Sequence, residues 1–113
     1  MKKAYRIKKN SEFQDIFQTG KSFANRELVI YYKEKPSQDH FRIGISVGKK
    51  IGNAVVRNQV KRYIRESFHQ LEESIKNDVD IIIIARKPVV HMKCSDIKRS
   101  LTHLLRKQCL LYK

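Results

Sequence analysis

Apolar and polar residues alternate along parts of this chain with the spacing of β-strands. In FRIGISV, residues 41–47, every second residue is apolar, which is the period-two pattern of a strand with one buried face. The run DIIIIA, residues 80–85, has four consecutive isoleucines, as is typical of a central strand buried on both faces. A third β-like stretch, residues 22–33, has LVIYY at its centre. These segments predict a small sheet.

A first helix is predicted at about residues 11–19, behind an irregular segment at residues 1–10. Ser11 is a favourable N-cap, and Gln14 stands three residues later, which is the spacing of a capping box. Gly20 follows the last turn, at the position where glycine commonly ends a helix.

Two further helices have apolar residues at helical spacing. One is predicted at about residues 54–70, with Asn53 as its N-cap. The other is predicted to begin near Ser95. Its apolar stripe consists of Ile97, Leu101, Leu104 and Leu105. The order of elements is therefore a helix, two or three strands, a helix, a strand and a helix, which indicates an α+β sandwich with helices packed on a small sheet.

The length and charge of the chain limit its class. With 113 residues, the chain is expected to form one domain, residues 1–113. Its 25 lysines and arginines outnumber 11 acidic residues, so the net charge is +14. Such self-repulsion destabilises a compact protein unless a polyanion binds to it. Nucleic acid is the first candidate, and an anionic membrane surface is the second.

Other features argue against membranes, secretion and metal sites. The longest apolar run, residues 81–85, is far too short to span a bilayer. The basic N-terminus has no apolar segment behind it, so it does not resemble a signal peptide. Cys94 and Cys109 lie far apart, without the spacing of a zinc site, and we interpret them as reduced thiols of a cytoplasmic protein.

The helix predicted at residues 54–70 has a cationic side. At about 100° per residue, five residues that contact phosphates well fall within an arc of roughly 140°. They are Arg57, Asn58, Lys61, Arg62 and Arg65. The apolar residues occupy a separate arc, and the nearest acid, Glu66, falls outside the cationic one. A solvated face normally alternates charges, so a face with only cations predicts nucleic-acid binding.

The loop before this helix extends the basic surface. In GKKIGN, residues 48–53, two glycines flank Lys49 and Lys50, and the loop ends at a helix N-terminus that favours phosphate. This pattern alone is weak. The Walker A motif is excluded, because no Gly-Lys-Ser or Gly-Lys-Thr is present.

Aromatic residues near the N-terminus are suited to unpaired bases. Phe13 and Phe17 lie one helical turn apart, and Tyr31 and Tyr32 point to opposite faces of a strand. Core packing and base stacking explain the two phenylalanines equally well at this level. A position at the rim of a cleft satisfies both interpretations.

A nuclease that acts without RNA needs clustered carboxylates or histidines. The four histidines stand alone along the chain. Asp78 and Asp80 form an Asp-x-Asp at a strand entry, which we interpret as a solubility feature of the strand edge. A helix-turn-helix DNA binder is also disfavoured, because the cationic helix lacks a partner helix joined by a tight turn.

The run RIGISVGKKIGNAVVRNQVKRYIRE, residues 42–66, resembles the signature of the bacterial ribonuclease P protein family. RIKKNSEFQDIFQTGKSFANRELVIYY near the start and DIIIIARKP before the last helix agree with it. The resemblance implies a two-layer α–β sandwich ordered αβββαβα, like domain 2 of ribosomal protein S5. It also implies a left-handed βαβ crossover, against the usual right-handed rule.

The resemblance implies an accessory subunit of an endoribonuclease, with no catalytic residue of its own. The RNA subunit would remove the 5′ leader of precursor tRNA by hydrolysis with Mg²⁺, held mainly by RNA. The protein would bind the catalytic RNA and the leader, with no membrane and no obligate protein partner. The alternative is a general basic RNA-binding or ribosome-associated protein.

The resemblance also assigns residues. The face for the RNA subunit consists of Lys49, Lys50, Arg57, Asn58, Lys61, Arg62 and Arg65. The leader cleft consists of Phe13, Phe17, Tyr31, Asn25 and Arg26. Two positions depart from the family pattern. Gln59 replaces a common cation and is expected outside the cationic arc, and Gly48 replaces a frequent serine.

Overall fold

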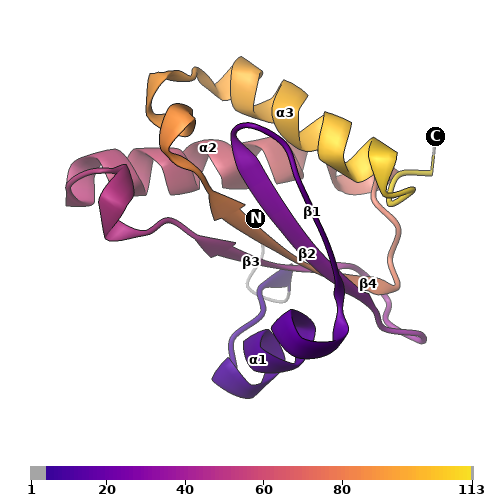
Figure 1. Ribbon diagram of the computed structural model, residues 1–113. Coiled ribbons are helices and arrows are strands. Elements are labelled where there is room, and N and C mark those ends of the chain that lie inside the picture. Colours follow the sequence, from indigo (N-terminus) through magenta and orange to yellow (C-terminus); the bar gives the residue numbers. More distant parts are fainter. Residues whose placement is uncertain (1–4, 113) are drawn as a thin grey trace.

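A computed structural model describes residues 5–112 of the chain (Figure 1). Its helices are α1 (Asn10–Thr19), α2 (Ala54–Leu71) and α3 (Cys94–Lys107). Its strands are β1 (Lys21–Ala24), β2 (Leu28–Glu34), β3 (Arg42–Ser46) and β4 (Val79–Ala85). Short 3₁₀ turns are η2 (Lys49–Ile51), η3 (Glu72–Ser74) and η4 (Lys87–His91).

The four strands form one sheet in the order β1-β2-β4-β3. β1 pairs with β2 and β2 with β4 in antiparallel fashion, whereas β3 and β4 are parallel. Because β4 lies between two strands, its isoleucines are buried on both faces of the sheet, and Ile81, Ile82 and Ile83 are all 0% exposed. The prediction of a doubly buried central strand is confirmed. The βαβ crossover that the family resemblance implies corresponds to β3–α2–β4, in which α2 connects the two parallel strands.

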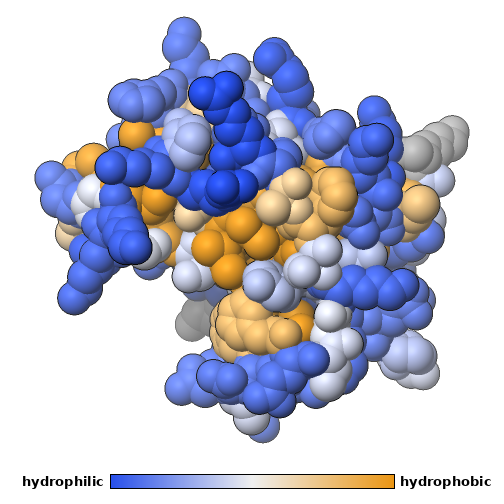
Figure 2. Space-filling view, in the orientation of Figure 1, coloured by the Kyte–Doolittle hydropathy of each residue, from blue (hydrophilic) through white to orange (hydrophobic). Residues whose placement is uncertain are grey.

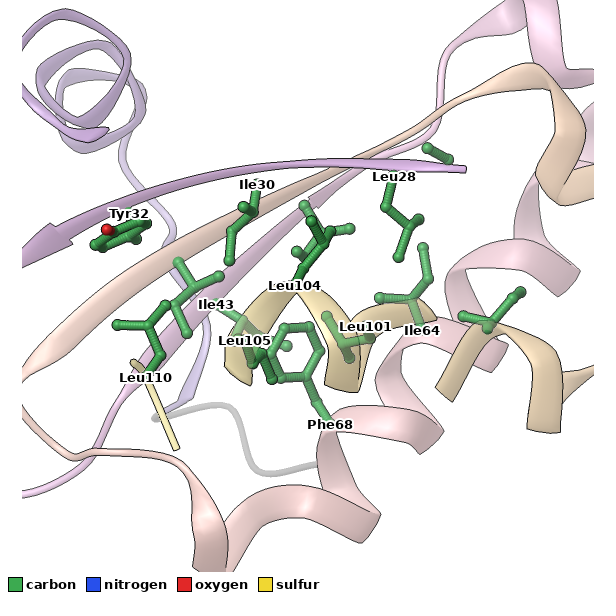
Figure 3. Packing of buried hydrophobic residues seen from close by; sticks show 14 of the residues in the cluster. Leu28, Ile30, Tyr32, Ile43, Ile64, Phe68, Leu101, Leu104, Leu105 and Leu110 are labelled. Atoms are coloured by element: carbon green, nitrogen blue, oxygen red, sulfur yellow. The ribbon is translucent and has the colours of Figure 1, made fainter. Parts of the chain in front are cut away.

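The helices divide between the two faces of the sheet. α2 and α3 cover one face, and α1 lies against the other (Figure 1). Figure 3 shows Leu28 and Ile30 of β2 facing Ile64 of α2 and Leu104 of α3 across the main core. A smaller cluster under α1 contains Ile16 and residues of the opposite sheet face. The α+β class and the order αβββαβα are confirmed, and the position of α1 adds a second, smaller apolar layer.

α1 begins one residue earlier than predicted, and its capping differs. Lys9 is the N-cap and makes no side-chain capping bond, so the capping box of Ser11 and Gln14 is wrong. Gly20 does end the helix, with its N–H donating to Ile16 O at 2.9 Å. Its backbone is extended, so glycine is needed for space: a Cβ would lie 2.6 Å from the carbonyl oxygens of Ile16 and Tyr32.

The capping prediction holds for α2 and fails for α3. The Asn53 side chain accepts a hydrogen bond from Val56 N at 3.0 Å, as expected of an N-cap. α3 begins at Cys94, so Ser95 lies inside it. Its N-cap is Lys93, whose N–H donates to the Asp96 carboxylate at 3.0 Å. The predicted stripe of α3 is confirmed. Ile97, Leu101, Leu104 and Leu105 are each 0% exposed.

Residues 5–9 belong to none of the named helices or strands, as the predicted irregular segment at residues 1–10 expects, but they pack against the sheet. Ile7 is 6% exposed, and its N–H donates to Ile43 O at 2.8 Å, which extends the sheet beside β3. The ring of Tyr5 stacks on His40, with 4.3 Å between centroids. An apolar residue and an aromatic ring therefore anchor this stretch. Residues 1–4 lie outside the described residues.

Within residues 5–112, no helix has the length and apolar character needed to cross a membrane. Cys94 and Cys109 are both free thiols, in agreement with the interpretation from the sequence.

Candidate nucleic-acid interface

The cationic surface of α2 consists of Arg57, Asn58, Lys61, Arg62 and Arg65. Asn58 and Arg62 are exposed, whereas the other three are half-buried. Among residues 5–112, none of the four cations forms an ion pair. Their mutual repulsion is therefore not relieved within the described part of the chain.

The cationic and apolar arcs of α2 are not as separate as the sequence predicts. Phe68 is fully buried, yet on an ideal helix its side chain points between those of Arg57 and Lys61. Arg57 Nε is itself buried and has no hydrogen-bond partner among the described residues. The cations therefore flank the packed face, with their stems against the protein and their charged ends directed outward.

Gln59 shares a groove with two of the cations. Together with Val55, Asn58, Arg62 and Arg65 it lines a groove on the outer side of α2. Its Nε2 donates to the hydroxyl of Tyr63 at 2.7 Å, and the Arg62 guanidinium lies 5.9 Å from the same tyrosine ring. Gln59 thus borders the cations in this groove, while its position on the helix stays outside the arc that they occupy.

The loop before α2 is ordered by one apolar residue. It forms the turn η2, in which Ile51 is buried and Lys49 and Lys50 are exposed. Gly52 has a φ of 158°, and a Cβ there would lie 3.0 Å from the Val56 side chain. The loop thus holds both lysines at the N-terminal end of the cationic surface.

The aromatic residues of α1 face the sheet. The rings of Phe17 and Tyr31 meet edge to face, 4.9 Å apart, and Phe17 is 39% exposed. Phe13 packs directly over Gly44 of β3, where a Cβ would lie 2.5 Å from its ring. Tyr32 points to the opposite face, is buried, and donates to Gln108 Oε1 at 2.8 Å. Phe13 thus mainly packs, whereas Phe17 lies at the rim.

Asn25 and Arg26 do not join this aromatic cluster. They form the turn between β1 and β2, and the Asn25 side chain is directed to α3, where its Nδ2 donates to Ser100 Oγ at 2.8 Å. Its Oδ1 accepts from the backbone N–H groups of Glu27 and Leu28. Asn25 therefore shapes a turn and ties it to α3, while the exposed Arg26 borders the same helix.

A small pocket connects the aromatic cluster to the cationic surface of α2. It lies at the edge of β3 and is lined by Arg6, Ile7, Arg65 and residues 43–45. Gly44 belongs to this pocket and also touches Phe13, so the two predicted sites meet there. Arg6 was not predicted as a site residue. The sequence signal for this location is Gly44, since a glycine within a strand often marks a close approach.

Asp80 has a role that the sequence analysis missed. It is 0% exposed, and Arg42 donates to its two oxygens at 3.0 and 2.6 Å. The same guanidinium donates to Glu12 of α1 at 2.6 Å. The interpretation of Asp80 as a strand-edge solubility feature is wrong, because its carboxylate lies inside the fold and is paired there.

The charges of this network alter the proton affinities of its members. The hydrogen bond from Arg42 lowers the pKa of Glu12, while burial acts in the opposite direction. The hydrogen bond to Asp80 raises the pKa of Arg42. On the same face of the sheet, the hydrogen bond from Lys33 at 2.8 Å lowers the pKa of Asp15. The ion pairs of Glu12 with Arg42 and of Asp15 with Lys33 join α1 to the sheet.

The described residues do not fit a Mg²⁺ site. Within residues 5–112, no group of three or more histidines, cysteines and acidic residues is arranged to hold a metal ion. Glu12 and Asp80 converge, but on the guanidinium of Arg42, which repels a cation. We therefore derive no chemical step from a metal held by this chain.

Comparisons with known proteins agree with this geometry. A family model described as ribonuclease P matches residues 1–109. The ribonuclease P protein component of Oceanobacillus iheyensis is 65% identical over 111 residues, covering 98% of this chain and 92% of the relative. The ribonuclease P protein component of Listeria welshimeri is 58% identical over 106 residues, covering 94% of this chain and 89% of the relative.

Solved structures show the same fold. The ribonuclease P protein of Staphylococcus aureus superposes with a TM-score of 0.88 at 50% identity, over 96% of this chain and 98% of that one. The ribonuclease P protein of Thermotoga maritima superposes with a TM-score of 0.82 at 31% identity, over 90% of this chain and 96% of that one. With its fold, its family model and its relatives in agreement, the chain belongs to the bacterial ribonuclease P protein family, the protein component of the ribonuclease P endoribonuclease.

Proposed function

We propose that this protein binds the catalytic RNA of ribonuclease P through the cationic surface of α2 and holds the 5′ leader of precursor tRNA near α1. The observation that carries this proposal is the set of four unpaired cations on α2, Arg57, Lys61, Arg62 and Arg65, with Lys49 and Lys50 beside them. Phosphates of a folded RNA supply the counter-charge that the described chain lacks. Their binding releases condensed counterions, which favours association.

The aromatic cluster supports a single-stranded partner on the opposite face of the sheet. Phe17 exposes part of its ring at the rim, and Tyr31 supports that ring from β2. Unpaired bases stack on such rings with little dependence on sequence. Figure 2 shows hydrophobic surface where α1 faces the strands, which is the surface that bases would cover.

The pocket at Gly44 supports a continuous path for the leader. Arg6 and Arg65 line it beside the ring of Phe13. A strand stacked on α1 would place its phosphates near both arginines before reaching the α2 surface. The protein would thus position the leader relative to the catalytic RNA, and bidentate contacts from arginine suit phosphate oxygens.

In the proposed complex, the RNA subunit and this chain have different tasks. The RNA subunit would perform the hydrolysis with Mg²⁺ bound to RNA, while this chain supplies binding and orientation. We place the reaction in the bacterial cytoplasm, where precursor tRNA is made. Correct positioning of a substrate accelerates a reaction without a catalytic side chain on the protein.

The test is cleavage of precursor tRNA by a bacterial ribonuclease P RNA at low Mg²⁺, with and without this protein. Two double variants that lose equal charge, K61Q/R62Q on α2 and the matched control K21Q/K76Q, are compared with the unchanged protein. Lys21 and Lys76 line a different pocket, which also contains Glu34 and Asp78. We expect stimulation by the wild type and the control, and a large loss for K61Q/R62Q.

Two outcomes would contradict the proposal. If K61Q/R62Q stimulated cleavage as much as the wild type, the surface that binds the RNA subunit would not be the cationic surface of α2. Tight binding to unrelated RNA without stimulation of cleavage would support the alternative of a general basic RNA-binding protein. Thermal unfolding of each variant shows that lost activity does not come from a lost fold.

A further inference from the structure

A second basic surface lies on α3, away from the groove on α2. Seven residues of α3 line a shallow depression along the helix, four of them cations and none acidic. A neighbouring hollow between α3, η4 and the β1–β2 turn shares Arg99 and His103 with it. We call this combined region the α3 groove. Its cations are Arg26, Lys98, Arg99, Arg106 and Lys107.

Two acids, Glu27 and Asp96, also line the α3 groove, in the hollow beside the β1–β2 turn. Asp96 accepts a hydrogen bond from the N–H of Lys93 at the start of the helix. Glu27 accepts one from the hydroxyl of Ser100 at 3.0 Å. Within residues 5–112, none of the five cations forms an ion pair. Because the five cations outnumber the two acids, the groove keeps an excess of positive charge, and Figure 2 shows hydrophilic surface over α3.

The β1–β2 turn is fixed against α3, which holds Arg26 at the border of the groove. Asn25 Nδ2 donates to Ser100 Oγ at 2.8 Å and approaches Ser100 O at 3.3 Å. From the other side, Arg86 donates to Asn25 O at 2.8 Å. These bonds position the turn before any ligand arrives, so little ordering is needed when Arg26 meets an anion.

We propose that the α3 groove binds the phosphate backbone of a second RNA segment, distinct from the segment on the cationic surface of α2. The two surfaces share no lining residue. Lys98 and Arg99 lie about two helical turns before Arg106 and Lys107, with Thr102 and His103 on the turn between them, and Arg99 and Arg106 are both exposed. Such a row follows a phosphate backbone, which is a line of evenly spaced negative charges. A protein with two such surfaces clamps two parts of a folded RNA, or the RNA subunit and its substrate.

The chemistry favours RNA backbone over base recognition. The groove offers cations, hydroxyl groups and two histidines, but no phenylalanine, tyrosine or tryptophan ring among its lining residues. Contacts of this kind fix orientation without reading sequence. The inference rests on the proposed function only in that the partner is RNA of the same complex.

The test compares three double variants with equal loss of charge: R99Q/R106Q, K61Q/R62Q and the control K21Q/K76Q. Binding of the full chain to ribonuclease P RNA, and to the RNA with precursor tRNA, is measured as a function of salt. For R99Q/R106Q we expect weaker binding and a log–log salt slope reduced by about 1–2, because each lost phosphate contact reduces it by about 1. Hydroxyl-radical footprinting should show protections lost in R99Q/R106Q that K61Q/R62Q retains.

Each result has a definite meaning. A salt slope for R99Q/R106Q equal to that of K21Q/K76Q would overturn the inference, since net charge alone would then explain binding. Loss of the same protections in R99Q/R106Q and K61Q/R62Q would also overturn it, because one RNA segment would span both surfaces. If only K61Q/R62Q impairs cleavage and binding, the proposed function stands and this inference fails. Binding to phosphatidylglycerol vesicles that requires Arg99, with unchanged RNA binding, would assign the groove to a lipid surface instead.

Discussion

Arg42 and Asp80 stand opposite each other on the parallel strands β3 and β4, and their side chains form a buried ion pair. Nε and Nη2 of Arg42 donate to the two carboxylate oxygens at 3.0 and 2.6 Å. Nη2 also donates to Glu12 at 2.6 Å. One guanidinium therefore links an edge strand to the central strand and to α1, the helix that carries Phe13 and Phe17.

Removal of Arg42 should destabilise the protein more than removal of the pair. In R42A the Asp80 carboxylate is left buried without its partner, which typically costs about 3–5 kcal/mol. In R42A/D80A that charge is gone, so the loss should be smaller than the sum of the single losses. Urea unfolding of the wild type, both single variants and the double variant measures the coupling. Additive losses would show that the pair contributes little.

Stability should depend on pH through Glu12. Its pKa in the folded protein lies below the ordinary value of 4.5, because Arg42 donates a hydrogen bond to the carboxylate. The unfolded chain then binds the proton more readily, so this contribution is present above about pH 4.5 and is lost as the pH falls through the lowered pKa. In E12Q, the free energy of unfolding should depend less on pH in this range. D15N should change the stability only at more acidic pH, because the ordinary pKa of Asp15 is 3.8 and the fold lowers it further.

Gly44 should not tolerate even a methyl group. A Cβ at this position lies 2.5 Å from the Phe13 ring, so G44A must displace that ring, with an expected loss of about 1–3 kcal/mol. F13L should restore part of the loss by making room. G48A is the matched control, because a Cβ there meets nothing within 4 Å and its φ of −75° suits alanine. Its stability should be unchanged or higher by about 0.4–1 kcal/mol.

Phe17 should contribute to leader binding more than to stability. It is 39% exposed, and stacking of one base on an aromatic ring is worth about 1–3 kcal/mol. F17A should therefore weaken binding of precursor tRNA but not of mature tRNA, which has no leader. Phe23 on β1 is 40% exposed and provides an equivalent control. If F23A weakened leader binding as much as F17A, the assignment of the leader to α1 would fail.

The cationic surface of α2 should give RNA binding a steep salt dependence. About five phosphate contacts predict a log–log slope of roughly −3 to −5, and a slope near −1 would exclude this surface as the main contact. R62Q should reduce the slope by about 1 without a change in stability, because Arg62 is exposed. R57Q should affect both properties, since Arg57 Nε is buried against the helix.

Predictions from local patterns succeeded where neighbouring residues decide the outcome. The stripe of α3, the N-cap Asn53 and the isoleucine run of β4 all depend on spacing within one segment, and the structure confirms them. The capping predictions at Ser11 and Ser95 failed, because each helix starts one residue earlier. Capping by short polar side chains is a weak preference that the rest of the fold easily overrides.

Predictions that join distant segments were less complete. Asn25 and Arg26 were grouped with Phe13 and Phe17 by resemblance, but hydrogen bonds to Ser100 direct their turn to α3. Asp80 was interpreted as a surface residue because the sequence does not show that Arg42 stands opposite it. Such contacts span tens of residues along the chain and arise only from strand register and helix packing.

The sequence by itself determined the α+β class, the order of elements, the cationic side of α2 and the family, because these follow from periodicity, charge and a long specific motif. Tertiary structure alone decided the placement of α1 against the second face of the sheet, the pocket that joins Gly44 and Arg65, the packing of Phe13 on Gly44, and the α3 groove beside Arg26. The physical reason is that side chains acquire partners only when strands pair and helices pack. Neither the pairing of Arg42 with Asp80 nor the tether of Asn25 to α3 is encoded in any short stretch of the chain.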